Sequence, residues 1–351
     1  GAAERLSAAE RGERRRKGTM ARQVFRTELT KLLGIKHPVI CGGMHHVTFA
    51  NLAAAVSNAG GLGTITALTQ PDPEALRKEI RQCKELTSNP FAVNLTLLPM
   101  LVPPDYNAFA NVVVEEGVKV VETAGHYKGL EPFVKLFKDN DIKIIHKCTQ
   151  VRHAKTAERM GVDAVSIDGF EAAGHPGEAD VGLFVLLTKA AREIKIPVLA
   201  TGGIGTGEQL AAALALGAAG INMGTRFMAT KEARIHDNIK KALVDGDENS
   251  TALIMRTMRN TERVYKNKAV EDLMAIESKH PGEFDKIKHL ISGQIYKRVF
   301  QETGDIDEGV WSAGIVMGLI DDVPTVEELV LRIVGDAEEI VAQRLPGMLV
   351  K

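Results

Sequence analysis

Eight short runs of β-branched and other apolar residues recur along the chain, roughly every 20 to 35 residues, and a helix-like segment follows each run. Repeated strand and helix units of this kind are typical of a parallel sheet, because parallel strands need a crossover connection between them. The runs span residues 39–40, 62–65, 91–95, 118–122, 142–146, 164–168, 198–201 and 221–223. The sequence therefore predicts an α/β protein with eight parallel strands.

The residues that follow the predicted strands distinguish a closed barrel from an open sheet. In a barrel every strand ends at the same mouth, so polar residues after the strands would converge where barrel enzymes keep their sites. An open sheet usually has a glycine fingerprint after its first strand, which this sequence lacks. We therefore expect a (β/α)8 TIM barrel. The residues concerned are Gly42-Gly43, Asn94, Lys147, Asp168-Gly169, Gly202-Gly203 and Gly224-Thr225.

The predicted barrel occupies residues 25–232, and two later segments depart from the repeat of strands and helices. Residues 233–300 have the pattern of several amphipathic helices, which we interpret as a small cap over the mouth; an oligomerisation arm would look the same in sequence. Residues 301–351 contain the only tryptophan, Trp311, and are expected to return to the barrel. A stiff, apolar loop after the third strand predicts a substrate gate. The gate residues are Pro99, Pro103 and Pro104.

A basic head precedes the predicted barrel at residues 1–24. It contains the run Arg14-Arg15-Arg16-Lys17 and no apolar stretch. It also has more acidic residues than an organelle-targeting segment normally contains. We interpret it as a flexible head and favour a cloning remnant over the end of a targeting segment.

Charge and composition argue against several classes of partner. The formal net charge of -1 gives no global field to attract nucleic acid. No apolar run approaches the roughly 20 residues that cross a bilayer, so we expect no membrane insertion and a cytoplasmic protein. Three cysteines fit neither a disulfide framework nor a zinc cluster and predict reduced thiols. His45 and His46 lack a carboxylate at metal-ligand spacing, so we assign no metal.

Two glycine motifs form the strongest local signal. Residues 201–204 (TGGI) follow the seventh predicted strand, and residues 222–226 (NMGTR) overlap the end of the eighth and continue past it. A phosphate needs bare backbone N–H groups at close approach, and barrel enzymes frequently bind one after strands seven and eight. We therefore predict a phosphorylated ligand at these motifs; two tight turns without a ligand are the alternative.

Three polar residues extend this predicted site. His175 lies in a long glycine-bearing loop after strand six, and an imidazole suits proton transfer near neutral pH. Lys147 would place a cation in the mouth, and Asn94 has donors and an acceptor that suit the edge of a heterocycle. Each residue also has an interpretation without a function: a structural histidine, a solvated lysine and a turn-forming asparagine.

Taken in order, these residues resemble the nitronate monooxygenase-like family, also called 2-nitropropane dioxygenase-like, whose members are FMN enzymes with a barrel and a small helical domain. The similarity runs from about residue 25 to residue 349. Six motifs look more narrowly like the branch of the family that acts as NADH:quinone reductase. They are residues 94–99, 121–125, 146–149, 166–178, 221–227 and 311–314.

The resemblance implies an FMN site in the barrel mouth. The residues implied at the phosphate are Gly202, Gly203, Gly224 and Thr225. The residues implied around the ring are Gly43, Met44, Asn94, Lys147 and Asp168. The remaining implied cofactor-binding residues are Gly169, Gly174 and Met223. His175 matches the family's active-site histidine, whereas Cys41 departs from the family, whose members often carry glutamine before Gly-Gly-Met.

The resemblance also implies a reaction: hydride transfer from NADH to FMN, followed by delivery of two electrons to a quinone. Lys147 and His175 are then the catalytic residues, Lys147 stabilising negative charge and His175 donating a proton or hydrogen bond to the quinone oxygen. The alternatives are a nitronate monooxygenase, a flavin-dependent enoyl reductase and, outside the enzymes, a catalytically silent FMN-binding scaffold. Expected partners are small molecules (NADH, quinone or nitronate), and the oligomeric state stays open, a homo-oligomer included.

Overall fold

A parallel barrel forms the body of the protein. The computed structural model describes residues 22–97, 103–125, 129–291 and 293–350. Within these residues, eight parallel strands form one sheet in the order β1-β8-β7-β6-β5-β4-β3-β2. A bridge between Ile40 and Leu62 joins its two ends, so the predicted (β/α)8 barrel is confirmed. The strands are β1 (Val39–Cys41), β2 (Gly63–Thr66), β3 (Phe91–Leu97), β4 (Val120–Gly125), β5 (Lys143–Cys148), β6 (Ala164–Asp168), β7 (Val198–Thr201) and β8 (Gly220–Met223).

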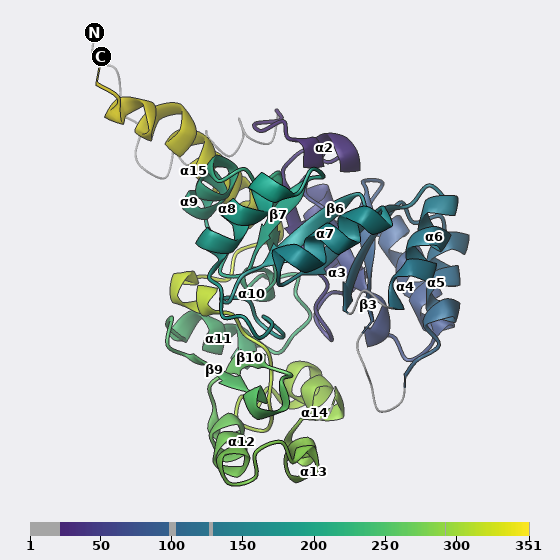
Figure 1. Ribbon diagram of the computed structural model, residues 1–351, viewed down its shortest axis with the longest axis vertical. Coiled ribbons are helices and arrows are strands. Elements are labelled where there is room, and N and C mark those ends of the chain that lie inside the picture. Colours follow the sequence, from purple (N-terminus) through teal and green to yellow (C-terminus); the bar gives the residue numbers. More distant parts are fainter. Residues whose placement is uncertain (1–21, 98–102, 126–128, 292, 351) are drawn as a thin grey trace.

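Helices surround the sheet and connect the end of each strand to the start of the next (Figure 1). The last of them, α15, packs against α9 and α3 and so completes the ring after a long excursion of the chain. A Cβ on Gly207 of α9 would lie 2.7 Å from the Ile333 carbonyl oxygen, so glycine lets these two helices approach closely. The barrel helices are α3 (Ala50–Asn58), α4 (Pro73–Leu86), α5 (Tyr106–Glu115), α6 (Glu131–Asp139), α7 (Val151–Met160), α8 (Leu183–Glu193), α9 (Gly207–Ala215) and α15 (Val326–Glu339).

The amino-terminal end of the barrel is filled by an apolar layer. Side chains alternate between the two faces of a strand, so every second residue points into the barrel. Leu29 and Leu33 of the short helix α2 (Glu28–Leu33) pack against inward residues at the starts of β1 to β7. Those residues are Ile40, Leu62, Ala92, Val120, Ile145, Ala164 and Leu199. Helix α2 therefore plugs this end, and a ligand has access only to the opposite one.

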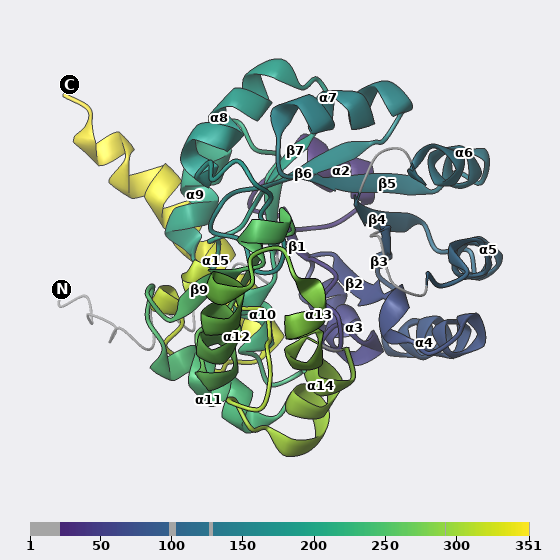
Figure 2. The ribbon, with the colours of Figure 1, turned by 60° about the horizontal axis from the view of Figure 1, so that its bottom comes forward.

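A second, smaller unit interrupts the barrel between β8 and α15. Figure 2 shows its helices α12, α13 and α14 in front of the barrel. Residues 233–300 were expected to be helical, but they also contain an antiparallel pair of strands, β9 and β10. The pair has a core of its own with α12, in which Ile254, Val264 and Leu273 are fully buried. The elements are α10 (Thr225–Met228), α11 (Asp237–Asp245), β9 (Thr251–Ile254), β10 (Glu262–Tyr265), α12 (Lys268–Lys279), α13 (Phe284–Ile287) and α14 (Gly293–Arg298).

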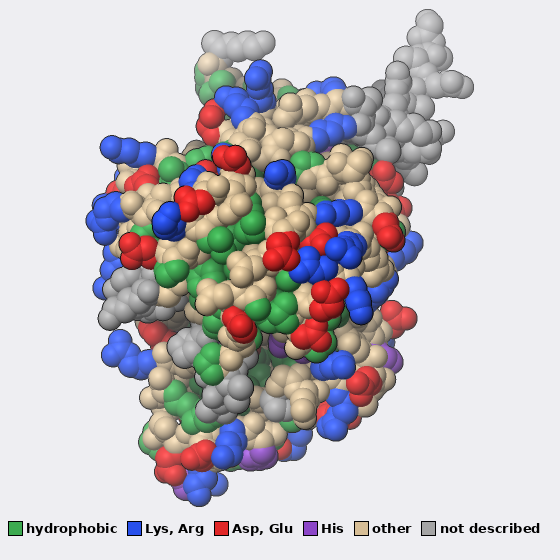
Figure 3. Space-filling view, turned by 90° about the vertical axis from the view of Figure 1, so that its right-hand side faces the viewer, with side chains coloured by type: hydrophobic (Ala, Val, Ile, Leu, Met, Phe, Trp, Pro, Cys, Tyr) green, Lys and Arg blue, Asp and Glu red, His purple; other side chains and the backbone are tan. Residues whose placement is uncertain are grey.

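The outer face of the barrel over α4, α5 and α6 carries both signs of charge, with basic and acidic side chains interspersed (Figure 3). Arg77 of α4 forms ion pairs with Glu115 and Glu116 at the end of α5. Arg81 and Lys84 also pair with Glu116. Pairs on an exposed surface contribute little stability each, so their main effect is to balance the local charge. Among the described helices, none combines the length and the apolar character that a membrane crossing requires.

One buried histidine at the plugged end makes the fold sensitive to acid. His37 is 0% exposed, and neither ring nitrogen has a hydrogen-bond partner among the described residues. Burial, with a smaller effect of Lys36, lowers the pKa of His37 to about 4. An unfolded histidine titrates near pH ~6.5. The stability that neutral His37 provides is therefore present above about pH 6.5 and is lost as the pH falls toward 4.

We expect His37→Phe to reduce the loss of unfolding free energy between neutral pH and pH 4 by up to about 3 kcal/mol, because phenylalanine has no group to protonate. Urea unfolding at a series of pH values measures this loss. His289→Phe, at an exposed histidine of the smaller unit, is the matched control and should follow the parent. A His37→Phe protein that loses as much stability as the parent would show that His37 does not drive the acid response.

Candidate functional site

The inward-facing positions change from apolar to polar two residues further along each strand. Because the side-chain period of a strand is two, these residues form the next layer of the barrel interior. The register keeps the layer level: Asn94 lies opposite Glu122, and Lys147 lies opposite Ser166. The layer comprises Gly42, Thr64, Asn94, Glu122, Lys147, Ser166, Thr201 and Asn222. A polar floor therefore lies below the mouth.

Glu122 is the centre of a hydrogen-bond network in this floor. Its carboxylate is 1% exposed, and Oε2 accepts from the Gly43 backbone N–H at 2.8 Å and from Asn94 Nδ2 at 2.8 Å. Oε1 accepts from Asn222 Nδ2 at 2.8 Å, and the same amide also donates to Ser166 Oγ at 3.2 Å. Charge-assisted hydrogen bonds of this kind are strong, so Glu122 fixes the orientation of both amides.

Glu122 is not among the site residues predicted from the sequence, although it lies in the motif at residues 121–125. The available signal was a glutamate inside a strand whose neighbours, Val120, Val121 and Thr123, are all buried. A carboxylate at such a position needs partners, since an unpaired buried charge is costly. Its three donors come from β3, β8 and the end of β1, which the sequence alone does not place together.

Lys147 and Asp168 form an ion pair in the mouth. Lys147 Nζ lies 4.0 Å from Asp168 Oδ2, and the lysine side chain is only 22% exposed. Burial acts to lower the pKa of Lys147, but the charges of Asp168 and Glu122 outweigh this and raise it. Burial raises the pKa of Asp168 to about 6, an effect that Lys147 opposes. The neighbouring carboxylates therefore favour the charged form of Lys147, which lies within β5 rather than beyond its end.

The predicted phosphate loop after β7 has backbone that favours glycine. Gly202 has φ +90° and Gly203 has φ +71°, a region in which other residues are strained. A Cβ on Gly202 would lie 2.9 Å from the Ala172 backbone nitrogen. A Cβ on Gly203 would lie 2.9 Å from Glu171 Cβ. Both glycines are thus required by the fold itself, because the loop after β6 packs directly against them.

The turn after β8 lies beside this loop, since β7 and β8 are neighbours in the sheet. Gly224 precedes helix α10, and a Cβ there would meet only Met44 Sδ, at 3.4 Å. Thr225 Oγ1 accepts a hydrogen bond from the Gly314 N–H at 3.0 Å. Met44 therefore lies against Gly224, and Gly314, which was not among the predicted site residues, lies against Thr225.

Three buried oxygens in the floor and mouth have no hydrogen-bond partner among the described residues. They are Thr64 Oγ1, Asp168 Oδ1 and Asn222 Oδ1. Backbone also approaches the amides closely, since a Cβ on Gly42 would lie 2.6 Å from Asn222 Oδ1 and a Cβ on Gly43 would lie 2.4 Å from Asn94 Cβ. Buried polar atoms are normally paired, so these oxygens fit the polar edge of a bound ligand.

The loop after β6 holds His175 and is fastened by the smaller unit. Gly174, with φ +69°, exchanges two backbone hydrogen bonds with Arg263 of β10, at 3.0 and 2.6 Å. The Arg263 guanidinium donates to the Phe170 carbonyl oxygen and stacks over the Phe170 ring. His175 itself is exposed. Arg263, absent from the predicted site, therefore positions the loop next to the histidine.

The remaining predicted site residues are Met223, Gly169 and the three gate prolines. The side chain of Met223 is buried in the main core, and its carbonyl oxygen accepts from the Gly42 N–H at 3.0 Å. The Gly169 N–H donates to the Thr201 carbonyl oxygen at 2.9 Å. The gate remains a prediction, because Pro99 lies outside the described residues. Pro103, exposed, and Pro104, half-buried, precede α5.

The three cysteines and the adjacent histidines His45 and His46 do not belong to the floor, the ion pair or the glycine turns described above. Cys41, Cys83 and Cys148 are free and buried, and burial raises the pKa of the Cys41 thiol. The rings of His45 and His46 lie 4.0 Å apart. Across the described parts of the chain there is no group of three or more His, Cys, Asp or Glu suited to a metal ion.

Known proteins share this arrangement. FabK from Thermotoga maritima is 34% identical, covers 93% of this chain and 100% of its own, and superposes with a TM-score of 0.85. A Mycobacterium tuberculosis protein named as (3aS,4S,5R,7aS)-5-hydroxy-7a-methyl-1-oxo-octahydro-1H-indene-4-carboxyl-CoA dehydrogenase is 30% identical over 89% of this chain and 96% of its own length. A probable nitronate monooxygenase of Staphylococcus saprophyticus is 32% identical over 65% of this chain and 75% of its own length.

The family relationship rests on a match to a family model over most of the chain. The model of the nitronate monooxygenase family fits residues 26–336, which include the barrel and the smaller unit. This range contains the polar floor, the ion pair in the mouth and both glycine turns. The chain therefore belongs to the nitronate monooxygenase family of flavin-type oxidoreductases.

Proposed function

We propose that this chain is an FMN-dependent NADH:quinone reductase. FMN, when bound, supplies the redox chemistry: it takes a hydride from a nicotinamide and passes two electrons to an acceptor. The six motifs that resemble the NADH:quinone reductase branch support the quinone assignment. The observation that carries the proposal is Lys147, a cation held inside the mouth by Asp168 and Glu122.

The residues present fit FMN. Bare backbone at Gly202, Gly203, Gly224 and Thr225 would hold the phosphate, because glycine turns expose N–H groups at close range. The polar floor would hold the ring. Asn94 and Lys147 of the floor, together with Gly43, Met44 and Asp168 beside it, would contact the ring, and Asp168 Oδ1 and Asn222 Oδ1 are unpaired among the described residues.

Each side chain has a distinct task in this proposal. Lys147 keeps a positive charge beside the cofactor and so favours the state that carries the additional electrons. Glu122 holds the Asn94 and Asn222 amides in one orientation, so their donors and acceptors are ready for the ring edge. His175, on the exposed loop, donates a proton or hydrogen bond to the quinone oxygen.

His175 favours quinone reduction over attack on a carbon-bound proton. A histidine that acts as a general base is normally oriented by a second group, as in a catalytic triad. No carboxylate among the described residues forms a hydrogen bond with His175 in this structure. An exposed imidazole without such a partner suits the weaker demand of donating to an oxygen.

Two further reactions have specific support. Oxidation of a nitronate is supported by the family model over residues 26–336 and by the Staphylococcus relative. A flavin-dependent reaction on a CoA thioester, the substrate class closest to the enoyl reductase alternative, is supported by the Mycobacterium relative, which is named as a dehydrogenase of a carboxyl-CoA. Both would use the same cofactor pocket, so they differ from the quinone reductase in the electron donor or the acceptor.

Anaerobic stopped-flow mixing separates these reactions. The purified protein is mixed with NADH, with NADPH and with a preformed alkyl nitronate, and bleaching of the flavin absorbance is recorded. Reoxidation by a quinone, an enoyl thioester or oxygen is then followed. We expect rapid bleaching by NADH and rapid recovery with quinone. Rapid bleaching by nitronate without measurable bleaching by NADH would overturn the proposal, and a colourless protein that cannot be loaded with FMN would overturn every flavin assignment.

A further inference from the structure

The carboxyl-terminal segment carries an apolar stripe beyond the body of the protein. Along α15 the stripe is buried, with Ile333 at 1% and Ala337 at 0% exposure, and Ile340 still reaches the core at 8%. Beyond Ile340 the chain continues in helical turns away from the barrel, as both ribbon views show (Figures 1 and 2).

This projecting segment, residues 341–350, exposes apolar side chains at the same helical spacing. Val341 and Leu345 are each 43% exposed, Met348 is 67% exposed and Leu349 is 75% exposed. Positions four and then three residues apart lie on one side of a helix. The stripe of apolar side chains therefore continues from the buried part of the helix onto the exposed surface. An exposed apolar surface of this kind indicates a binding site for a partner.

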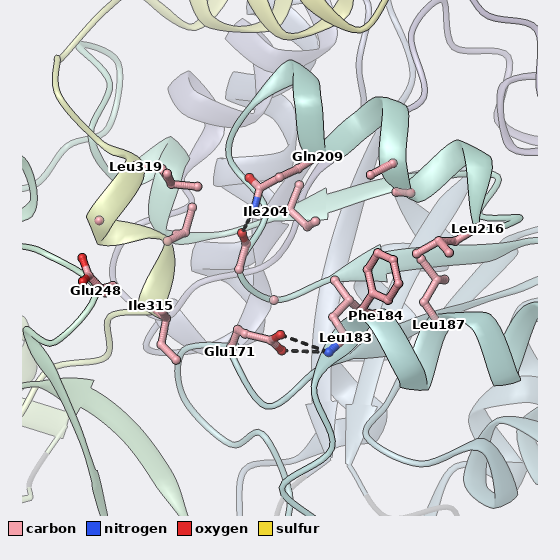
Figure 4. A pocket seen from close by; sticks show the side chains of 16 residues that line it. Glu171, Leu183, Phe184, Leu187, Ile204, Gln209, Leu216, Glu248, Ile315 and Leu319 are labelled. Atoms are coloured by element: carbon pink, nitrogen blue, oxygen red, sulfur yellow. Dashed lines mark hydrogen bonds between the residues drawn. The ribbon is translucent and has the colours of Figure 1, made fainter. Parts of the chain in front are cut away.

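An apolar groove of about 460 Å³ lies between α8 and α9 on the same side of the barrel (Figure 4). Phe184 and Leu187 line it from α8, Leu216 lines it beyond α9, and Leu319 closes it from the segment before α15. Phe184 is 70% exposed and Leu319 is 51% exposed, which is high for large apolar side chains. Gly202 and Gly203 also line the groove, whereas Gly224 and Thr225 do not.

We propose that residues 341–350 of a second copy of this chain occupy this groove, and that the exchange is reciprocal in a two-fold dimer. Groove and projecting segment flank the same helix: α9 contributes Ala212 and Ala213 to the groove, while Gly207 packs against α15. A two-fold axis beside α9 would therefore bury both apolar surfaces on both chains at once. Seating a helical stripe in an apolar groove is a common mode of recognition.

Charge complementarity favours this occupant. Residues 341–350 contain one charged residue, the basic Arg344. The charged residues that line the groove are Glu171 and Glu248, both acidic. The Glu171 carboxylate already accepts from the Leu183 N–H at 3.0 Å. Among the described residues, the exposed Glu248 accepts only from the neighbouring Asn249 amide through Oε1, so its Oε2 can pair with Arg344, which within its own chain lies near Glu208. A neutral acyl chain or a lipid would use the apolar wall but would bring no basic group to Glu248.

Sedimentation velocity and light scattering at micromolar concentration test the dimer. The parent should have twice the chain mass of 38.0 kDa. Phe184→Asp, and a chain that ends after Ile340, should each have the mass of one chain. Leu86→Asp changes an apolar side chain of similar exposure (47%) on α4 and should stay dimeric. A monomeric parent, or dimers that persist in both altered proteins, would overturn the proposal.

Cysteine cross-linking identifies the occupant of the groove. Phe184→Cys and Leu349→Cys are made in separate chains, mixed and oxidised, and a disulfide-linked pair of two different chains is expected. The three native thiols are buried and give the background in the parent. Absence of the mixed pair would overturn the proposal, as would an internal disulfide within one chain that carries both changes and forms no linked pair.

Discussion

Gly224→Val is expected to fold like the parent and to purify without FMN. Gly224 has φ −116°, outside the left-handed region that favours glycine, and a Cβ there meets only the flexible Met44 side chain, with Sδ at 3.4 Å and Cγ at 3.8 Å. The fold therefore tolerates a side chain, whereas a phosphate held by backbone N–H groups does not. We expect FMN affinity to fall at least about 100-fold, or roughly 2.7 kcal/mol.

The ratio of flavin to protein absorbance and a titration of the apoprotein with FMN measure this loss. Gly129→Val is the matched control, since a Cβ at Gly129 has no neighbour within 4 Å. Gly203→Val is a poorer test, because its φ of +71° and the contact with Glu171 strain the fold whether or not FMN binds. Full FMN occupancy in Gly224→Val would show that the phosphate lies elsewhere.

The barrel could be predicted because its signals are local. Each strand is a short apolar run, and the helices between them start at recognisable caps, such as Asp72 before α4 and the capping box of Thr206 and Gln209 at α9. The choice of a barrel over an open sheet rested on polar and glycine residues after the strands. That argument succeeds because closure brings all strand ends to one mouth.

The polar floor was harder to predict from the sequence than the barrel fold. Lys147 was placed just after its strand but lies within β5, and Asn94 lies in the middle of β3. Glu122 was not assigned a role, since its value depends on three donors from distant strands. The alternation of side chains along the strand could have identified Glu122. Residues two apart point to the same face, so Glu122 must point into the barrel interior like the apolar Val120.

The smaller unit shows a different limit of sequence reasoning. Strands β9 and β10 have four residues each and only partly buried patterns, so their periodicity is too short to distinguish them from helix. Besides pairing with β9, β10 makes two non-local bridges: Arg263 pairs with Gly174, and Val264 pairs with Ser312. The hairpin therefore links the loop that holds His175 to the segment that returns to the barrel, a relationship that no local pattern encodes.

His175→Ala is expected to separate the half-reactions of the proposed quinone reductase. Hydride transfer from NADH needs no protein base, so the anaerobic rate of flavin bleaching should stay within several-fold of the parent. Donation to the quinone oxygen needs a positioned acid, and such groups typically contribute about 100 to 10,000-fold. The quinone half-reaction should therefore slow by a factor in that range, and stopped-flow traces of the two half-reactions measure both effects on one sample.

The same variant gives the opposite pattern in a nitronate monooxygenase. A base is needed there to remove the carbon-bound proton of a neutral nitroalkane but not to oxidise a preformed nitronate, which has already lost that proton. His175→Ala would then lose nitroalkane oxidation and keep nitronate oxidation, while NADH bleaches neither protein. Because the loop is fastened through Gly174 and Arg263 rather than through His175, the alanine variant should keep its backbone and its FMN. The step that slows therefore reports the chemistry of the imidazole, and an unchanged rate in every half-reaction would remove His175 from the catalytic residues.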